Sequence, residues 1–236
     1  MIKYLVLSLS MLTTCSVGTI QAQVVSVPEP RFEVTGVVTG SILKVAEAVS
    51  QLPAGDTVHL VIDSPGGQVY PGMQLSQALD AARTRGSRVS CYVLKMAASM
   101  AFQFLAHCDD RYVMANSLLL WHPVRVSVGM GARFTPRAAS QLAADLRRVE
   151  DYLVMDLRTS FKLDQDQFLE HYHAETLHFG ADLKRLTPGW VQLVVDIQIP
   201  GRTYTAPAPR VTPQGPTTLE YISPKVLKLW EATHAP

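Results

Sequence analysis

Short apolar runs alternate with segments of helical periodicity along most of the chain. The first clear pair is the β-branched run "VHLVID" at 58–63, followed by apolar residues three or four apart between Gly72 and Arg83. The alternation continues with strand-like runs at 89–94, 111–115 and 118–122 and with helical segments at 97–107 and 137–163. Strands that alternate with helices in this way predict an α/β fold with a mostly parallel sheet.

The first 22 residues have the layout of a secretory signal peptide. One early lysine precedes an apolar run from Tyr4 to Leu12, and small and polar residues follow. The run is shorter than the roughly 20 residues that span a bilayer, so we expect cleavage near Ala22 and a periplasmic or secreted protein. Cys15 suggests lipid anchoring instead, although a threonine rather than a small residue precedes it. An ordinary N-terminal strand or helix is the remaining interpretation.

The length of 236 residues allows one domain with a full hydrophobic core, which we place at 23–199. From Pro200 onwards the composition shifts to Pro, Thr and Ala. Such a segment buries too little apolar surface to fold alone, so residues 200–236 are predicted to form a flexible tail. Within the tail, "SPKVLKLWEA" at 223–232 has the pattern of a short docking helix.

The charge pattern excludes several classes of partner. With 21 basic and 20 acidic side chains, the chain has no global field that would attract nucleic acid or an anionic surface. His171 and His173 could suggest a metal site, but no third ligand stands at a suitable spacing. We therefore expect no nucleic acid, no metal and no cofactor.

Two cysteines, Cys91 and Cys108, remain if the signal peptide is removed. Cys91 falls early on a predicted strand and Cys108 at the far end of the helix that runs back after it. A pair in an exported protein favours a disulfide. Two buried free thiols are the alternative.

A Pro-Gly-Gly corner follows the strand at 58–63, with Gly66 and Gly67 at its end. Glycines at a strand end often only supply a turn with positive φ. Two in succession also leave backbone N–H groups that can approach a ligand or a developing negative charge.

Two further residues could complete a site for nucleophilic catalysis. Ser99 lies where a strand passes into a helix, and His122 ends an apolar strand. Each is more often structural when taken alone, a serine at such a place being an ordinary N-cap. Together they offer the nucleophile, the base and the backbone donors that serine hydrolysis needs.

Three segments carry a resemblance to a known family. "VIDSPGGQVYPGM" at 61–73, "AASMAFQFLA" at 97–106 and "NSLLLWHP" at 116–123 are similar to signature blocks of the Clp protease proteolytic subunit, ClpP, and its relatives in the ClpP/crotonase superfamily. The resemblance spans roughly residues 34–195. It implies a fold of repeated β-β-α units with a mostly parallel sheet.

Carried over residue by residue, the resemblance makes Ser99 the nucleophile and His122 its general base. The backbone amides of Gly67 and Met100 would then form the oxyanion hole. A substrate could add to the sheet edge near this cleft as an extended strand.

The third member of the triad is where the chain departs from the family. The usual acid position falls on Leu177, which cannot orient a histidine. Glu175, two residues earlier, could point to the same side of an extended segment and is our candidate acid. Asp182 or another carboxylate could serve instead, and a Ser-His dyad is a further alternative. Lys95 suggests a Ser-Lys arrangement like that of signal peptide peptidase A, but strand alternation does not place its amine beside Ser99.

The sequence thus predicts an exported ClpP-like serine endopeptidase that cleaves peptides or unfolded proteins through an acyl-enzyme. The resemblance implies a homo-oligomeric ring, with the helix at 137–163 making contacts between rings. No Clp ATPase partner is expected if the protein is exported, because the periplasm lacks ATP. The alternatives are a ClpP-fold scaffold or binding protein that lost the triad acid, and acyl-CoA chemistry of the crotonase kind, against which the blocks around Ser99 and His122 argue.

Overall fold

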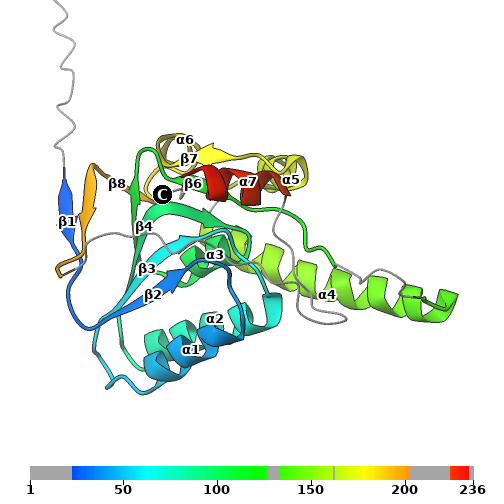
Figure 1. The fold of residues 1–236 in the computed structure, drawn as a ribbon, viewed down its shortest axis with the longest axis horizontal. Coiled ribbons are helices and arrows are strands. Elements are labelled where there is room, and N and C mark those ends of the chain that lie inside the picture. Colours follow the sequence, from blue (N-terminus) through cyan, green and yellow to red (C-terminus); the bar gives the residue numbers. More distant parts are fainter. Residues whose placement is uncertain (1–22, 127–132, 162, 202–223, 234–236) are drawn as a thin grey trace, which may run out of the picture.

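The computed structural model describes residues 23–126, 133–161, 163–201 and 224–233, and its centre is a single twisted sheet (Figure 1). In this described part the strand order is β2-β3-β4-β5-β8, with β6 paired to β4 and β7 paired to β6. All of these pairs are parallel except β6 with β7. The strands are β2 (Arg31–Thr35), β3 (Val58–Ser64), β4 (Val89–Ala98), β5 (Asp110–Met114), β6 (Leu118–Leu120), β7 (His178–Phe179) and β8 (Gln192–Val194). The predicted α/β class with a mostly parallel sheet is confirmed.

Two further strands, β1 (Val24–Ser26) and β9 (Asp196–Gln198), form a separate parallel pair. Helices α1 and α2 lie together on one side of the sheet, and α4 extends well beyond the body of the molecule (Figure 1). Among the described residues, no helix combines the length and the apolar character needed to cross a membrane. The helices are α1 (Leu43–Ser50), α2 (Val69–Thr84), α3 (Met100–Gln103), α4 (Pro136–Phe161), α5 (Gln165–Ala174), α6 (Gly180–Leu186) and α7 (Pro224–Thr233), with the short 3-10 helices η1 (Gly40–Ile42) and η2 (Phe104–His107).

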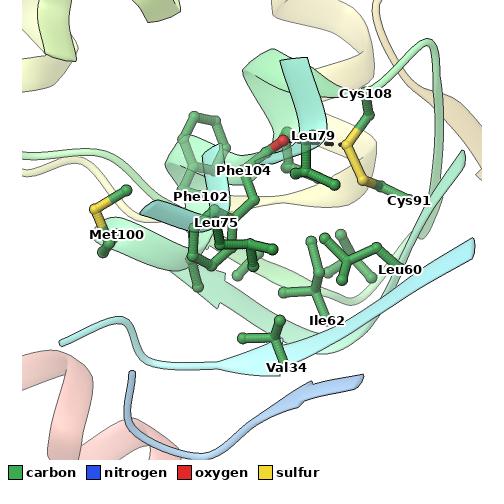
Figure 2. Packing of buried hydrophobic residues seen from close by; sticks show 14 of the residues in the cluster. Val34, Leu60, Ile62, Leu75, Leu79, Cys91, Met100, Phe102, Phe104 and Cys108 are labelled. Atoms are coloured by element: carbon green, nitrogen blue, oxygen red, sulfur yellow. Dashed lines mark hydrogen bonds between the residues drawn. A yellow bond between two sulfur atoms is a disulfide. The ribbon is translucent and has the colours of Figure 1, made fainter. Parts of the chain in front are cut away.

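The core follows the period-two alternation of the strands. On β3, Leu60 and Ile62 belong to the main apolar cluster, together with Leu75 and Leu79 of α2 (Figure 2). Val61, between them, belongs to a second cluster that β1 and β9 cover from the other face. Burial on both faces explains why the run at 58–63 is apolar almost throughout instead of alternating with polar residues.

Strand β4 changes its partner halfway along. Ser90–Val93 pair with β5, whereas Met96–Ala98 pair with β6. The strand therefore continues to Ala98, and the prediction of a helix from residue 97 is wrong at its start. Parallel pairing with β3 and β6 outweighs the helix propensity of the two alanines. The consequence is that the chain turns sharply at Ser99.

A disulfide joins Cys91 on β4 to Cys108, just beyond η2 (Figure 2). Both residues are buried, with at most 1% of their surface exposed. The bridge fixes the end of the α3–η2 segment to the sheet. The two cysteines are 17 positions apart, and the segment that the bridge closes contains Ser99.

The docking helix predicted within the tail is present as α7. Trp230 of α7 is buried in an apolar cluster with Met96 and Ala98 of β4 and with Leu118 and Leu120 of β6. The predicted signal peptide at 1–22, with Cys15, and residues 202–223 of the predicted tail lie outside the described residues.

Candidate active site

Ser99 sits in a tight turn between β4 and α3. Its backbone has φ 54° and ψ −126°, and positive φ is uncommon for residues other than glycine. Such a conformation costs on the order of 1–3 kcal/mol, so the surroundings must hold it. The Ser99 N–H donates to the Leu120 carbonyl at 2.8 Å, and the Ser99 carbonyl accepts from Phe102 N–H at 3.0 Å. The turn is thus fixed to β6 on one side and to α3 on the other.

The Pro-Gly-Gly corner packs directly against this turn. Gly66 and Gly67 have φ values of 92° and 146°. A Cβ on Gly66 would lie 2.6 Å from the Ser99 Cβ, and one on Gly67 would lie 2.3 Å from the Val38 carbonyl oxygen. Only glycine fits at either position, because both the conformation and the space exclude a side chain.

The pairing of the corner with Val38 sets the direction of the Gly67 amide. Val38 N–H donates to the Gly66 carbonyl at 2.7 Å, and Gln68 N–H donates to the Val38 carbonyl at 2.8 Å. In a parallel bridge of this kind, the residue between the two bonded neighbours points its own N–H away from the partner strand. The Gly67 N–H is therefore directed away from Val38.

Gly72, the third glycine of the first signature block, has a packing role. A Cβ at this position would lie 2.2 Å from the Met100 Cγ. A side chain at residue 72 would force the Met100 side chain or helix α2 to shift. The glycine therefore helps to position Met100.

One small cavity, of about 40 Å³, brings the predicted residues together. Gly67, Ser99, Met100 and His122 all line it. Most of the remaining wall is apolar and comes from α2, the end of β6, α4 and α5. Its apolar side chains include Val69, Trp121, Val124, Leu153 and Leu157.

His122 is held in one tautomer by the backbone. It follows β6 and is 8% exposed, and its Nδ1 lies 2.7 Å from the carbonyl oxygen of Pro123. Because a carbonyl oxygen only accepts hydrogen bonds, Nδ1 carries the proton, and in the neutral ring Nε2 carries the lone pair. This is the form in which an imidazole acts as a general base.

The surroundings of His122 keep it neutral. Burial lowers the pKa of His122 to about 4; the nearby Arg125 charge also lowers it, and the hydrogen bond with Pro123 only partly opposes them. The ring is therefore uncharged at neutral pH, and an imidazolium formed here would be less stable than in water.

Glu175, the candidate acid, pairs with Arg125. It is the C-cap of α5 in a left-handed conformation, with φ 50°. The His122 Nδ1 meets the Pro123 carbonyl instead of this carboxylate. Asp182 accepts from the Phe179 N–H at 3.3 Å at the start of α6 and pairs with Arg185.

Leu177, the residue that the resemblance places at the acid position, lies in apolar surroundings. It is half-buried and packs against the cluster formed by Met96, Ala98, Leu118, Leu120 and Trp230. The Leu177 side chain therefore forms part of the apolar surface on which α7 packs. Lys95 lines a different cavity, with Met114 and Asp196, and is not part of the wall around Ser99.

Several residues of the cavity wall were not predicted from the sequence. Gln103 of α3 is one, and Arg125 is another. Tyr172 is a third: it donates to Glu150 at 3.0 Å, and burial with this nearby carboxylate raises its pKa. A usable signal existed only for Leu153 and Leu157, whose spacing of four marks one face of a helix. The His171 and His173 pair gave no metal site: the part of the chain described here contains no group of three or more His, Cys, Asp or Glu side chains that could hold a metal.

These observations define an α/β protein in which a strained serine, a neutral histidine and a glycine corner border one cavity. The family model for Clp protease matches residues 34–175, from β2 to the end of α5. The match spans more than half of the 236 residues. The chain belongs to the Clp protease family, which confirms the resemblance. A comparison with curated proteins gave no significant match.

Proposed function

We propose that this protein is a serine peptidase that uses Ser99 as nucleophile and His122 as general base. The observation that carries the proposal is that Gly67, Ser99, Met100 and His122, which come from three separate segments, line one cavity. Membership of the Clp protease family supports a peptidase of this class. The strained turn at Ser99 adds support, because such strain is concentrated at functional sites.

In the proposed mechanism, the Ser99 Oγ attacks the carbonyl carbon of a peptide bond while His122 Nε2 takes the hydroxyl proton. The oxyanion that forms accepts hydrogen bonds from the amides of Gly67 and Met100. His122 then gives its proton to the leaving amine, and the C–N bond breaks to leave an acyl-enzyme. Water, deprotonated by His122, hydrolyses the ester and restores Ser99.

The Pro123 carbonyl would take the orienting role of the triad acid. It fixes the tautomer that catalysis needs, as a carboxylate would. It lacks the full negative charge that stabilises an imidazolium, and Arg125 nearby has the opposite effect. We therefore expect a slower enzyme than one with a complete triad.

A non-catalytic scaffold is the second candidate function. The observation that favours it is that Leu177, at the predicted acid position, is an apolar residue packed in an apolar cluster. On this hypothesis the fold and the cavity persist, and the cavity binds peptides without cleaving them.

Export and ring assembly form part of the proposal. The Cys91–Cys108 disulfide supports an oxidising compartment such as the periplasm. In an ATP-free compartment the enzyme would act without an unfoldase, on peptides or unfolded chains. The N-terminal half of α4, which extends from the body, is the candidate for contacts between subunits (Figure 1).

A fluorophosphonate probe tests the catalytic proposal. It should label the folded protein at one site, and Ser99→Ala should abolish labelling. Ser41→Ala, at an exposed serine in η1, is the matched control and should label like the wild type. Absence of labelling in wild-type protein whose fold is verified by circular dichroism would favour the scaffold.

A further inference from the structure

His107 lies between two carboxylates on two different helices. The residue is 2% exposed, and its Nδ1 lies 3.0 Å from an Asp80 oxygen on α2. Its Nε2 lies 2.8 Å from an Asp156 oxygen on α4. Each ring nitrogen thus lies within ion-pair distance of a carboxylate oxygen, and two such neighbours favour the protonated, cationic imidazole. The cation joins η2 to α2 on one side and to α4 on the other.

The charges around His107 favour this protonated state. Burial lowers the pKa of His107, but the neighbouring carboxylates of Asp156 and Asp80 outweigh it and raise the pKa to about 9. Arg83 of α2 pairs with Asp80 and with Asp109, at 3.6 and 3.1 Å. Arg111 of β5 lines the same polar cavity as these groups. His107 is thus charged over the neutral pH range.

Asp156 connects this cation to the candidate active site. The Asp156 oxygen bound to His107 also accepts from the Gln103 side-chain amide at 2.9 Å. The same amide nitrogen lies 3.3 Å from the Leu153 carbonyl of α4. Gln103, Leu153 and Leu157 all line the cavity that contains Ser99. The Gln103 backbone N–H, in turn, donates to the Ser99 carbonyl at 3.2 Å.

We propose that His107 is a positioning residue for this site. As a cation between Asp80 and Asp156, it keeps the α4 wall of the cavity at a fixed position relative to Ser99. The connection runs through Asp156 and Gln103. The inference rests on the proposed function. His107 touches no residue of the proposed proton relay, and it acts on the site through the wall that would receive the substrate.

The geometry assigns unequal roles to the two carboxylates. Asp156 contacts both His107 and Gln103, whereas Asp80 contacts His107 and Arg83, neither of which lines the cavity. Loss of Asp156 therefore breaks the connection itself. Loss of Asp80 weakens the cation but leaves the contact between Asp156 and Gln103 in place.

The experiment compares rates of fluorophosphonate labelling in His107→Gln, Asp156→Asn and Asp80→Asn. Small displacements of substrate-positioning groups cost up to about 100-fold, so we expect His107→Gln and Asp156→Asn to lower the labelling rate by about 10-fold or more. Asp80→Asn should have a smaller effect. Asp145→Asn, an exposed residue on the same helix α4, is the matched charge control and should label at the wild-type rate.

A pH series separates positioning from a purely structural role. The pKa of His107 in the folded protein is raised to about 9, so the cation is present over the neutral range and is lost as the pH rises through about 9. Wild-type labelling should show this alkaline decline on top of any decline common to all variants, and His107→Gln should lack it. If His107→Gln does not fold, Asp156→Asn is measured in the same way.

The outcomes distinguish the two proposals. If the wild type labels at Ser99 while His107→Gln and Asp156→Asn label at the wild-type rate with an unchanged pH profile, the positioning role is wrong and the proposed function stands. If the folded wild type does not label at all, the proposed function fails and the positioning role fails with it.

Discussion

Two buried histidines in this fold have opposite electrostatic environments. His107 lies between two carboxylates and has a pKa raised to about 9. His122 meets a backbone carbonyl and lies near an arginine, and its pKa is lowered to about 4. Burial alone would lower both pKa values. The partner of each ring therefore decides whether the histidine holds charge or stays ready to accept a proton.

The two histidines therefore have different roles in the protein. His107 is a fixed cation that joins α2, η2 and α4, whereas His122 is a neutral ring beside the nucleophile candidate. A carboxylate beside His122 would make it more basic, and a carbonyl beside His107 would leave a buried ring without charge.

The largest effect is expected from removal of the His122 ring. His122→Ala should lower the fluorophosphonate labelling rate on the order of 1,000-fold or more, because the general base is lost. His107→Gln should cost far less in the same assay. Equal losses in the two variants, with both folded by circular dichroism, would remove the distinction between base and positioning residue.

A second large effect is expected at the glycine corner. Gly66→Ala would place a Cβ 2.6 Å from the Ser99 Cβ at a φ of 92°, so the turn must shift. We expect destabilisation of about 1–3 kcal/mol from backbone strain and a loss of labelling of about 100-fold, as for a displaced oxyanion donor.

Gly86→Ala is the matched control for this prediction. Gly86 has a similar φ of 87°, but a Cβ there would have nothing within 4 Å. Gly86→Ala should lower the free energy of unfolding without changing the labelling rate. Identical labelling of Gly66→Ala and wild type would show that the corner is not part of the site.

A moderate effect is expected in the dependence of stability on pH. The pKa of His107 is raised, so its stabilisation, about 3 kcal/mol for a shift of this size, is lost as the pH rises from about 6.5 through 9. The pKa of His122 is lowered, so its cost of about 3 kcal/mol develops as the pH falls from about 6.5 to 4. Buried His178, with a pKa lowered to about 4, adds to this acid decline.

Urea unfolding of wild type, His107→Gln and His122→Ala between pH 4 and 10 checks these signs. His107→Gln should flatten the alkaline decline, and His122→Ala should reduce the acid decline. An alkaline decline that persists unchanged in His107→Gln would mean that His107 is not a cation in the folded protein.

The smallest effect is expected at Glu175. Its pair with Arg125 is partly exposed, and such pairs contribute less than about 1 kcal/mol. Glu175→Gln should therefore change the free energy of unfolding by less than about 1 kcal/mol and the labelling rate by no more than a few-fold. A loss approaching 10,000-fold, the cost of a missing triad acid, would instead make Glu175 the acid.

The fold could be predicted from the sequence where periodicity was strong. The strand at 58–63 and the helices corresponding to α2 and α4 follow directly from their apolar spacing. The continuation of β4 to Ala98 did not follow, because it depends on pairing with β3 and β6, which lie elsewhere in the chain. Local helix propensity at 97–98 indicated the wrong element.

The candidate site, like the fold, could be predicted from the sequence only in part. Gly67, Ser99, Met100 and His122 stand in short motifs, and they line one cavity in the structure. The contact of His122 with the Pro123 carbonyl and the cation formed by Asp80, His107 and Asp156 have no local signal. Asp80 and Asp156 are 76 positions apart in the sequence, and only the tertiary fold brings both of them to His107.

The most direct test of the central claim is the pH dependence of Ser99 labelling by the fluorophosphonate, measured by intact-mass spectrometry. With neutral His122 as the base, the rate should be half-maximal near pH 4, the folded pKa of the ring, and constant from about pH 5.5 to 8. Ser99→Ala should show no adduct at any pH. Absence of an adduct in the wild type, or a rate that rises through pH 7 as for an ordinary solvated histidine, would contradict the account.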